Sequence, residues 1–178
     1  MTTWIALFRG INVGGNNLLP MAVLRSELEA LGLANVRSYI QSGNVVFDSP
    51  RKSSSALAKD IAGLVEEQHG FRPHLFLLRH EELLAAVEAN PFRGAEAEPK
   101  TLHFNFLSEP AVGVDLAALD ELRSPTEVIH LTDAVFYLHA PDGIGRSKLA
   151  AKAERHLGVT ATGRNFRTVA KLLEMSAG

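Results

Sequence analysis

The residues best suited to hold a ligand lie in two short stretches near the start of the chain. Residues 9–17 combine Arg, Gly and Asn, and residues 41–44 contain Gln, Ser and Asn. Glycine exposes backbone N–H groups, side-chain amides donate hydrogen bonds, and Arg carries a permanent positive charge. If the two stretches meet, they form a site for a phosphate or another polar ligand. The candidate residues are Arg9, Asn12, Gly14, Gly15, Gln41, Ser42 and Asn44.

Residues 9–17 match neither of two common nucleotide-binding motifs. They lack the GK[ST] of a Walker loop, and Gly10, Gly14 and Gly15 do not have the spacing of a dinucleotide fingerprint. A structural interpretation is equally open, because glycines permit a positive φ in a long turn while Asn and Gln bond exposed backbone groups.

A second candidate site combines residues 143–148 (GIGRSK) with residues 164–165 (RN). A helix N-terminus beside several cations attracts an anion. In the structural alternative, Ser147 caps a helix, the glycines shape a turn, and the arginines bond carbonyl oxygens or acids. We expect Asn165 to cap the last helix and Arg164 to point toward residues 143–148. The candidates here are Arg146, Ser147, Lys148, Arg164 and Asn165.

No motif in the sequence identifies a reaction. The chain has no Cys, which excludes disulfides, thiolate catalysis and Cys-ligated metal centres. G-x-S-x-G and H-E-x-x-H are also absent. Whether the chain is an enzyme therefore stays open, and neither a cofactor nor a metal is predicted.

Apolar periodicity and turn residues predict one order of elements that occurs twice. The first half has expected strands at 3–9, 36–41, 44–48 and 74–79, and helices at 20–31 and 53–69. A helix at 81–89 and a polar stretch at 90–100 follow. The second half has expected strands at 101–107, 127–132, 135–139 and 159–162, and helices at 115–122, 147–157 and 166–175.

This order predicts an α+β fold of two tandem ferredoxin-like (βαββαβ) halves with antiparallel sheets, plus a C-terminal helix. The expected halves are residues 1–90 and 91–178. The first two strands of such a unit run parallel, so residues 9–17 and the hairpin at 41–44 should lie at one edge of the sheet. We therefore expect Arg9 or Asn12 to lie within hydrogen-bonding reach of the hairpin.

Alternation along the second hairpin predicts two different sheet faces in the second half. The expected core face consists of Leu102, Phe104, Phe106, Ile129, Leu131, Phe136 and Leu138. The opposite, polar face would carry His103, Asn105, His130, Tyr137 and His139. Metal binding by these histidines is a weaker alternative to an ordinary polar surface.

Four stretches of the chain carry a resemblance to known proteins. They are RGINVGG at 9–15, YIQSGNVVF at 39–47, SKL at 147–149 and TGRNFRTV at 162–169. They resemble signature stretches of a bacterial family, the domain of unknown function 1697. The resemblance implies a duplicated ferredoxin-like fold and no assigned activity. This chain has Phe166 where the family usually shows Trp, and Gly163 where the family varies.

Composition limits the partners of the chain. Its 178 residues are 46% hydrophobic and 21% charged, as in globular proteins. A formal net charge of -2 gives no overall attraction for nucleic acid or anionic lipid. The apolar runs are far shorter than the roughly 18 residues of a membrane span, and the N-terminus lacks a basic leader. We expect a cytoplasmic protein away from membranes, and the oligomeric state stays open.

The leading functional interpretation is binding of a small phosphorylated or nucleotide-like ligand through the loop at Arg9 and the hairpin at Gln41, with catalysis left open. The alternative is a non-catalytic interaction module. Tyr39 and Phe47 on a ferredoxin-like sheet would suit RNA, whose bases stack on exposed sheet aromatics. The RNP sequence pattern is missing and the net charge is negative, so nucleic acid is the less favoured partner.

Overall fold

The computed structural model describes residues 1–178, which divide into two compact units. The first unit comprises Met1–Leu84 and Lys171–Gly178, and the second comprises Ala85–Ala170. The end of the chain therefore groups with the first unit, whereas the sequence analysis places it with the second half. The expected domain boundary at residue 90 stays a prediction.

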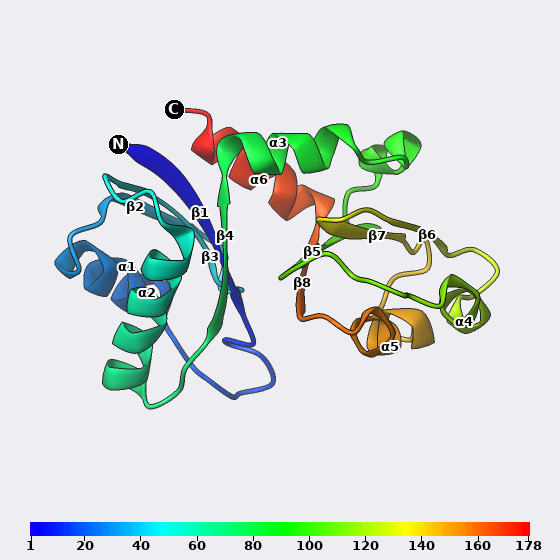
Figure 1. Ribbon diagram of the computed structural model, residues 1–178, viewed down its shortest axis with the longest axis horizontal. Helices are drawn as coiled ribbons and strands as arrows, with labels where there is room; N and C mark the ends of the chain where they lie inside the picture. Colours follow the sequence, from blue (N-terminus) through cyan, green and yellow to red (C-terminus); the bar gives the residue numbers. More distant parts are fainter. The chain divides into compact units, whose positions relative to one another are not determined.

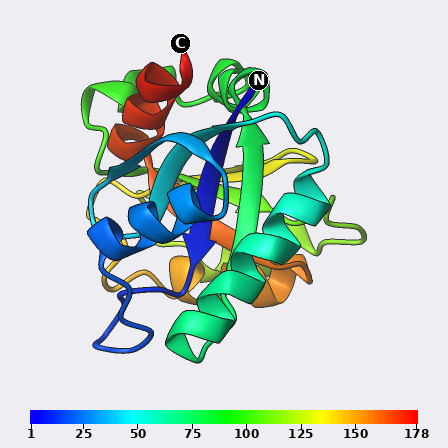
Figure 2. The same ribbon diagram turned by 90° about the vertical axis from the view of Figure 1, so that its left-hand side faces the viewer.

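The first unit follows the predicted βαββαβ order (Figure 1). Its strands are arranged β2-β3-β1-β4, and each neighbouring pair is antiparallel. Helices α1 and α2 lie side by side over one face of this sheet (Figure 2). The elements are β1 (Thr2–Arg9), α1 (Met21–Ala30), β2 (Ala34–Tyr39), β3 (Asn44–Ser49), α2 (Ser54–His69) and β4 (His74–Arg79).

Local signals and apolar packing explain the elements of the first unit. Ser53 Oγ accepts a hydrogen bond from Ala56 N at 3.3 Å and so caps α2, and Gly70 ends that helix with a φ of 77°. The core between helices and sheet includes Trp4, Ala6, Phe8, Leu24, Leu28, Val45, Phe47, Leu57, Ile61 and Val65. Since this core fixes β1, it also fixes the loop of candidate residues that follows β1.

The second unit repeats the same order. Its strands are arranged β6-β7-β5-β8, again all antiparallel. Apolar residues of α4 and α5 pack with Phe136 and Leu138 of β7 in one core. The elements are β5 (Leu102–Leu107), α4 (Leu116–Leu122), β6 (Val128–Leu131), β7 (Val135–His139), α5 (Lys148–Leu157) and β8 (Ala161–Asn165). The two predicted ferredoxin-like halves are confirmed.

Three further helices complete the chain. Helix α3 (His80–Glu88) and the short 3-10 helix η1 (Arg93–Ala97) lead from β4 to β5, and α6 (Phe166–Ser176) follows β8 directly. The boundaries of the two units fall within α3 and α6. None of the helices combines the length and the hydropathy that crossing a bilayer requires.

The register of β5 corrects the faces expected for the second sheet. His103 pairs with Leu138 and Asn105 pairs with Phe136, and paired residues of an antiparallel ladder share a face. His103 and Asn105 therefore lie on the face under α5. The opposite face, which includes Tyr137, carries the alternate β5 residues Leu102, Phe104 and Phe106.

The histidines of the second sheet consequently do not form one group. His130 pairs with Tyr137, and His139 pairs with Leu102, so both lie on the face opposite to His103. The expected grouping was wrong because a shift of one residue in register moves every side chain of a strand to the other face. Leu102 and Phe104 are buried on that other face. The apolar residues of β5 therefore point away from α5, and their alternation does not show which face of the sheet the helices cover.

Candidate functional site

The loop after β1 meets the hairpin between β2 and β3, as the topology predicted. The Asn12 side-chain amide donates hydrogen bonds to the carbonyl oxygens of Leu19 and Gln41, both at 2.8 Å. Its Oδ1 accepts a hydrogen bond from Leu19 N at 2.7 Å. Phe8 N donates to Gly43 O at 2.8 Å at the same junction. The expected hydrogen bond between Asn12 and the hairpin is confirmed.

Other amides in this region also bond to the protein itself. Asn17 Nδ2 donates to Gly10 O at 3.0 Å. The buried Asn44 side chain donates to Tyr39 O at 3.1 Å and to Ser42 Oγ at 2.9 Å. These side chains hold the loop and the hairpin in place, which supports the structural interpretation of Asn12 and Asn44.

The remaining candidates at this edge are exposed: Arg9, Gly14, Gly15, Gln41 and Ser42. Gly14 and Gly15, at the tip of the loop, have φ values of 57° and 77°. Such values favour glycine for conformational reasons alone. Ligand binding at these residues stays a prediction.

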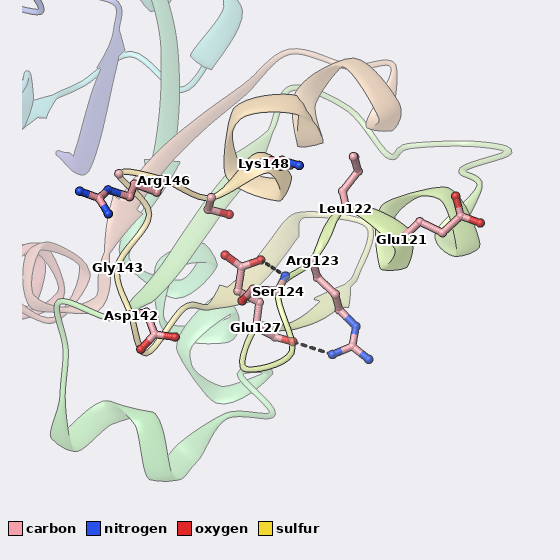
Figure 3. Close-up of a pocket in the computed structure, with 11 residues that line it drawn as sticks. Glu121, Leu122, Arg123, Ser124, Glu127, Asp142, Gly143, Arg146 and Lys148 are labelled. Carbon is pink, nitrogen blue, oxygen red and sulfur yellow. Dashed lines mark hydrogen bonds between the residues drawn. The ribbon is translucent and has the colours of Figure 1, made fainter.

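A cleft of about 780 Å³ lies in the second unit, between residues 121–127 and residues 142–148 (Figure 3). Three of the candidate residues, Arg146, Ser147 and Lys148, line it. Small-molecule sites in proteins have volumes of roughly 300–1,000 Å³. The structure thus brings this part of the second candidate site to a cleft of suitable size.

The wall that carries these residues is the N-terminus of α5. Ser147 Oγ accepts a hydrogen bond from Ala150 N at 3.0 Å, which confirms Ser147 as the cap of α5. Arg146 and Lys148 are both exposed. In Figure 3 the Arg146 side chain extends away from residues 121–127, whereas Lys148 lies on the side of Leu122. Two cations and the positive end of the helix dipole make this wall electropositive.

The facing wall contains a buried carboxylate. Glu127 is 4% exposed, and its Oε2 accepts a hydrogen bond from Ser124 N at 2.9 Å. Arg123 Nη1 donates to the Glu127 carbonyl oxygen at 2.9 Å and also forms an ion pair with Asp120. The sequence analysis missed this wall. Its signal is the SPTE sequence at 124–127, which has the capping-box spacing of a Glu that reaches back to a backbone N–H.

Two more carboxylates, Glu121 and Asp142, line the cleft and are exposed. Asp142 Oδ2 accepts a hydrogen bond from Thr126 Oγ1 at 2.7 Å, which links the turn before α5 to the facing wall. The cleft therefore carries charges of both signs: cations lie at the start of α5, and carboxylates come from Asp142 in the turn before α5 and from Glu121 on the facing wall.

Arg164 does not point toward residues 143–148, contrary to the prediction. It pairs with Phe104, on the sheet face opposite to α5, and its Nη1 donates to Thr162 Oγ1 and to Gly163 O, both at 2.8 Å. Burial lowers the pKa of its guanidinium to about 10, so the group stays charged at neutral pH. Strands β7 and β8 do end at the same edge, but alternation along β8 directs Arg164 to the other face.

Asn165 caps α6, as predicted, since its Oδ1 accepts a hydrogen bond from Thr168 N at 3.1 Å. We expect Asn165→Ala to lower the free energy of unfolding by about 1 kcal/mol, because that N–H loses its acceptor. Urea denaturation measures the loss. The matched control is Arg167→Ala, at an exposed position two residues further on, which should change stability by less than about 0.5 kcal/mol. Equal losses in both variants would contradict the cap.

Comparison with known proteins identifies a family. Residues 1–137 match the family described as "Protein of unknown function (DUF1697)", which is more than half of the chain. The chain belongs to the DUF1697 family. The match includes the stretches at 9–15 and 39–47, and the stretches at 147–149 and 162–169 lie beyond it. None of the curated proteins that were compared matches this DUF1697 chain.

One solved structure resembles this DUF1697 protein along almost its whole length. It is the conserved bacterial protein SP0830 from Streptococcus pneumoniae, with 29% sequence identity and a TM-score of 0.74. The alignment covers 98% of each chain. The likeness supports the duplicated α+β architecture beyond residue 137, where the family match ends.

Proposed function

We propose that this chain is a cytoplasmic protein that binds a small phosphorylated or nucleotide-like ligand in the cleft of its second unit. The observation that carries the proposal is the electropositive wall of that cleft, which combines Arg146, Lys148 and the N-terminus of α5. A phosphate group would lie against this wall, because the backbone N–H groups of the first helical turn and the Lys148 ammonium favour an anion there. The Arg146 side chain extends away from the facing wall (Figure 3) and adds its positive charge at longer range.

The carboxylates of the cleft suit the remainder of such a ligand. Asp142 and Glu121 are exposed to the cleft, and carboxylates accept hydrogen bonds from sugar hydroxyls and amino groups. A ligand with a phosphate at one end and hydroxyl or amino groups at the other would satisfy both sides. The same carboxylates would repel a ligand that is anionic throughout, which favours a sugar phosphate or nucleotide over inorganic polyphosphate.

The RNA-binding alternative loses its main support. Phe47 is fully buried in the core of the first unit, and Tyr39 is partly buried. Base stacking needs aromatic rings that are exposed on a sheet face. Phe47 therefore offers no surface on which a base could stack.

Lys148→Gln tests the proposed function. Thermal unfolding is followed with adenosine diphosphate, with glucose 6-phosphate and with inorganic phosphate. A ligand at 100 times its Kd raises the free energy of unfolding by about 2.7 kcal/mol. For Lys148→Gln we expect the Kd to rise about tenfold, since a hydrogen bond from a charged group contributes about 1.5–3 kcal/mol.

The matched control is Lys152→Gln, which removes the same charge from an exposed position of α5 that does not line the cleft. It should leave the Kd unchanged. The proposal fails if none of the three compounds stabilises the unmodified protein, or if Lys148→Gln and Lys152→Gln weaken binding equally.

A further inference from the structure

A smaller cavity of about 120 Å³ lies between the sheet of the second unit and α5. Its sheet side is formed by His103, Asn105 and Gly163 together with apolar residues of β7, and its helix side by Ala150 and Ala153. None of the residues that line the larger cleft contributes to it. Most of its lining is apolar, so the few polar atoms in it decide what it could bind.

One of the lining residues, His103, carries a buried nitrogen without a partner. His103 Nε2 makes no hydrogen bond, although the same imidazole bonds the Lys100 backbone. The bond to Lys100 therefore uses Nδ1, which leaves a lone pair on Nε2 of the neutral ring. Burial lowers the pKa of His103, so the ring is neutral at neutral pH. A buried acceptor without a donor destabilises the protein, because it has lost its hydrogen bonds to water without gaining a replacement.

A second acceptor lies beside it. Asn105 Nδ2 donates to Phe136 O at 3.1 Å, which leaves its Oδ1 as an acceptor. This oxygen lies close over Gly163, where an added Cβ would come within 2.7 Å of it. The absence of a side chain at residue 163 therefore makes room for the Asn105 side chain in its present position.

The first unit fills the corresponding place with a large side chain. In both sheets the edge strand runs directly into a helix, so Arg79 before α3 corresponds to Asn165 before α6. Arg79 pairs with Trp4, and Asn165 pairs with His103. His103 thus occupies the position of Trp4, which is 1% exposed and belongs to the first core.

The next residue pair on this face also has a larger apolar side chain in the first unit than in the second. Ala6 pairs with Leu77 in the first unit, and Asn105 pairs with Gly163 in the second. Leu77 packs against the first core, whereas Gly163 contributes no side chain. The cavity is therefore a property of the second unit rather than of the fold, because the same fold closes this place in the first unit with Trp and Leu.

We propose that this cavity binds a small, mostly apolar molecule that carries an N–H or O–H donor, about the size of a five-membered heterocycle. An apolar cavity of about 150 Å³ holds benzene in another protein, so about 120 Å³ suits a slightly smaller ring. The donor bonds His103 Nε2, and the apolar lining covers the rest of the molecule. None of the residues that line this cavity also lines the cleft proposed above for the phosphorylated ligand.

Two rings of equal size test the proposal. Pyrazole carries an N–H donor and isoxazole does not. Each is titrated into the ¹⁵N-labelled protein while the backbone amide signals and the His103 ring nitrogens are followed. We expect saturable shifts with pyrazole at residues 103–105 and 150–153, and a Kd at least tenfold lower for pyrazole than for isoxazole.

Ala150→Leu fills the cavity from the helix side and should raise the Kd for pyrazole at least tenfold. Ala151→Leu adds the same bulk at the next, exposed residue of α5 and should leave the Kd unchanged. If Ala150→Leu does not fold, His103→Leu replaces it. This variant lacks Nε2, so the preference for pyrazole over isoxazole should fall, and a preference as large as that of the unmodified protein would contradict the proposal.

Several results would overturn the proposal. If pyrazole causes no saturable shifts of the NMR signals, the cavity holds only water and the proposal is wrong. Equal binding of the two rings to the unmodified protein would show that His103 Nε2 makes no contact with a ligand. Equal weakening by Ala150→Leu and Ala151→Leu would place the binding elsewhere.

Discussion

Gly43→Ala is expected to lower the free energy of unfolding by about 2–5 kcal/mol. Gly43 has a φ of 80°, and an added Cβ would lie 2.7 Å from Phe8 Cβ and 2.8 Å from Ile11 Cδ1. The hydrogen bond from Phe8 N to Gly43 O, 2.8 Å long, holds the two backbones at this distance. Relief of the contact would therefore break the junction between the β1 loop and the hairpin.

Gly14→Ala is the matched control for Gly43→Ala. Gly14 also has a positive φ, 57°, but an added Cβ there would meet nothing within 4 Å. We expect a loss of about 1–2 kcal/mol, which is the conformational cost alone. Urea denaturation of the two variants measures both losses. Equal losses would show that the close approach of Gly43 to Phe8 has no energetic weight.

Asn12→Ala should have the second largest effect, a loss of about 2–4 kcal/mol in the free energy of unfolding. Three hydrogen bonds to backbone groups disappear, each worth about 1 kcal/mol. Ala also tolerates the φ of 53° at this position less well than Asn does. The same denaturation measurement applies. Asn16→Ala, an exposed position in the same loop, should cost less than about 0.5 kcal/mol.

Asn12→Ala also separates the two interpretations of the first candidate site. If the loop is structural and the ligand binds in the cleft of the second unit, the Kd for a phosphorylated ligand stays unchanged while stability falls. A tenfold rise in the Kd with unchanged stability would instead assign the ligand to the loop. It would also contradict the site proposed at Lys148.

The fold was largely predictable because its signals are local. Ser53, Ser147 and Asn165 precede apolar periodic segments, and each of them caps a helix in the structure. The contact of Asn12 with the hairpin was predictable as well, since it follows from the parallel direction of the first two strands. Element order thus fixed which loops meet at an edge.

Side-chain direction on the second sheet was not predictable in the same way. The register of β5 depends on pairing with strands that are distant in sequence. Its fully buried residues, Leu102, Phe104 and Phe106, lie on the face away from α5, whereas His103 and Asn105 under α5 are only partly buried. The prediction for Arg164 was wrong for the same reason, because the sheet face on which Arg164 lies depends on its pairing with Phe104. The position of Asp142 at the cleft depends on its hydrogen bond with Thr126, a contact between distant residues that no local pattern records.

Residues 143–147 form a wall that two cavities share. Gly143 and Gly145 line the cleft, while Ile144, between them, lines the small cavity beside His103. A ligand that displaces this turn from one side changes the shape of the other side. Since a coupling free energy is reciprocal, each ligand then alters the affinity of the other by the same factor.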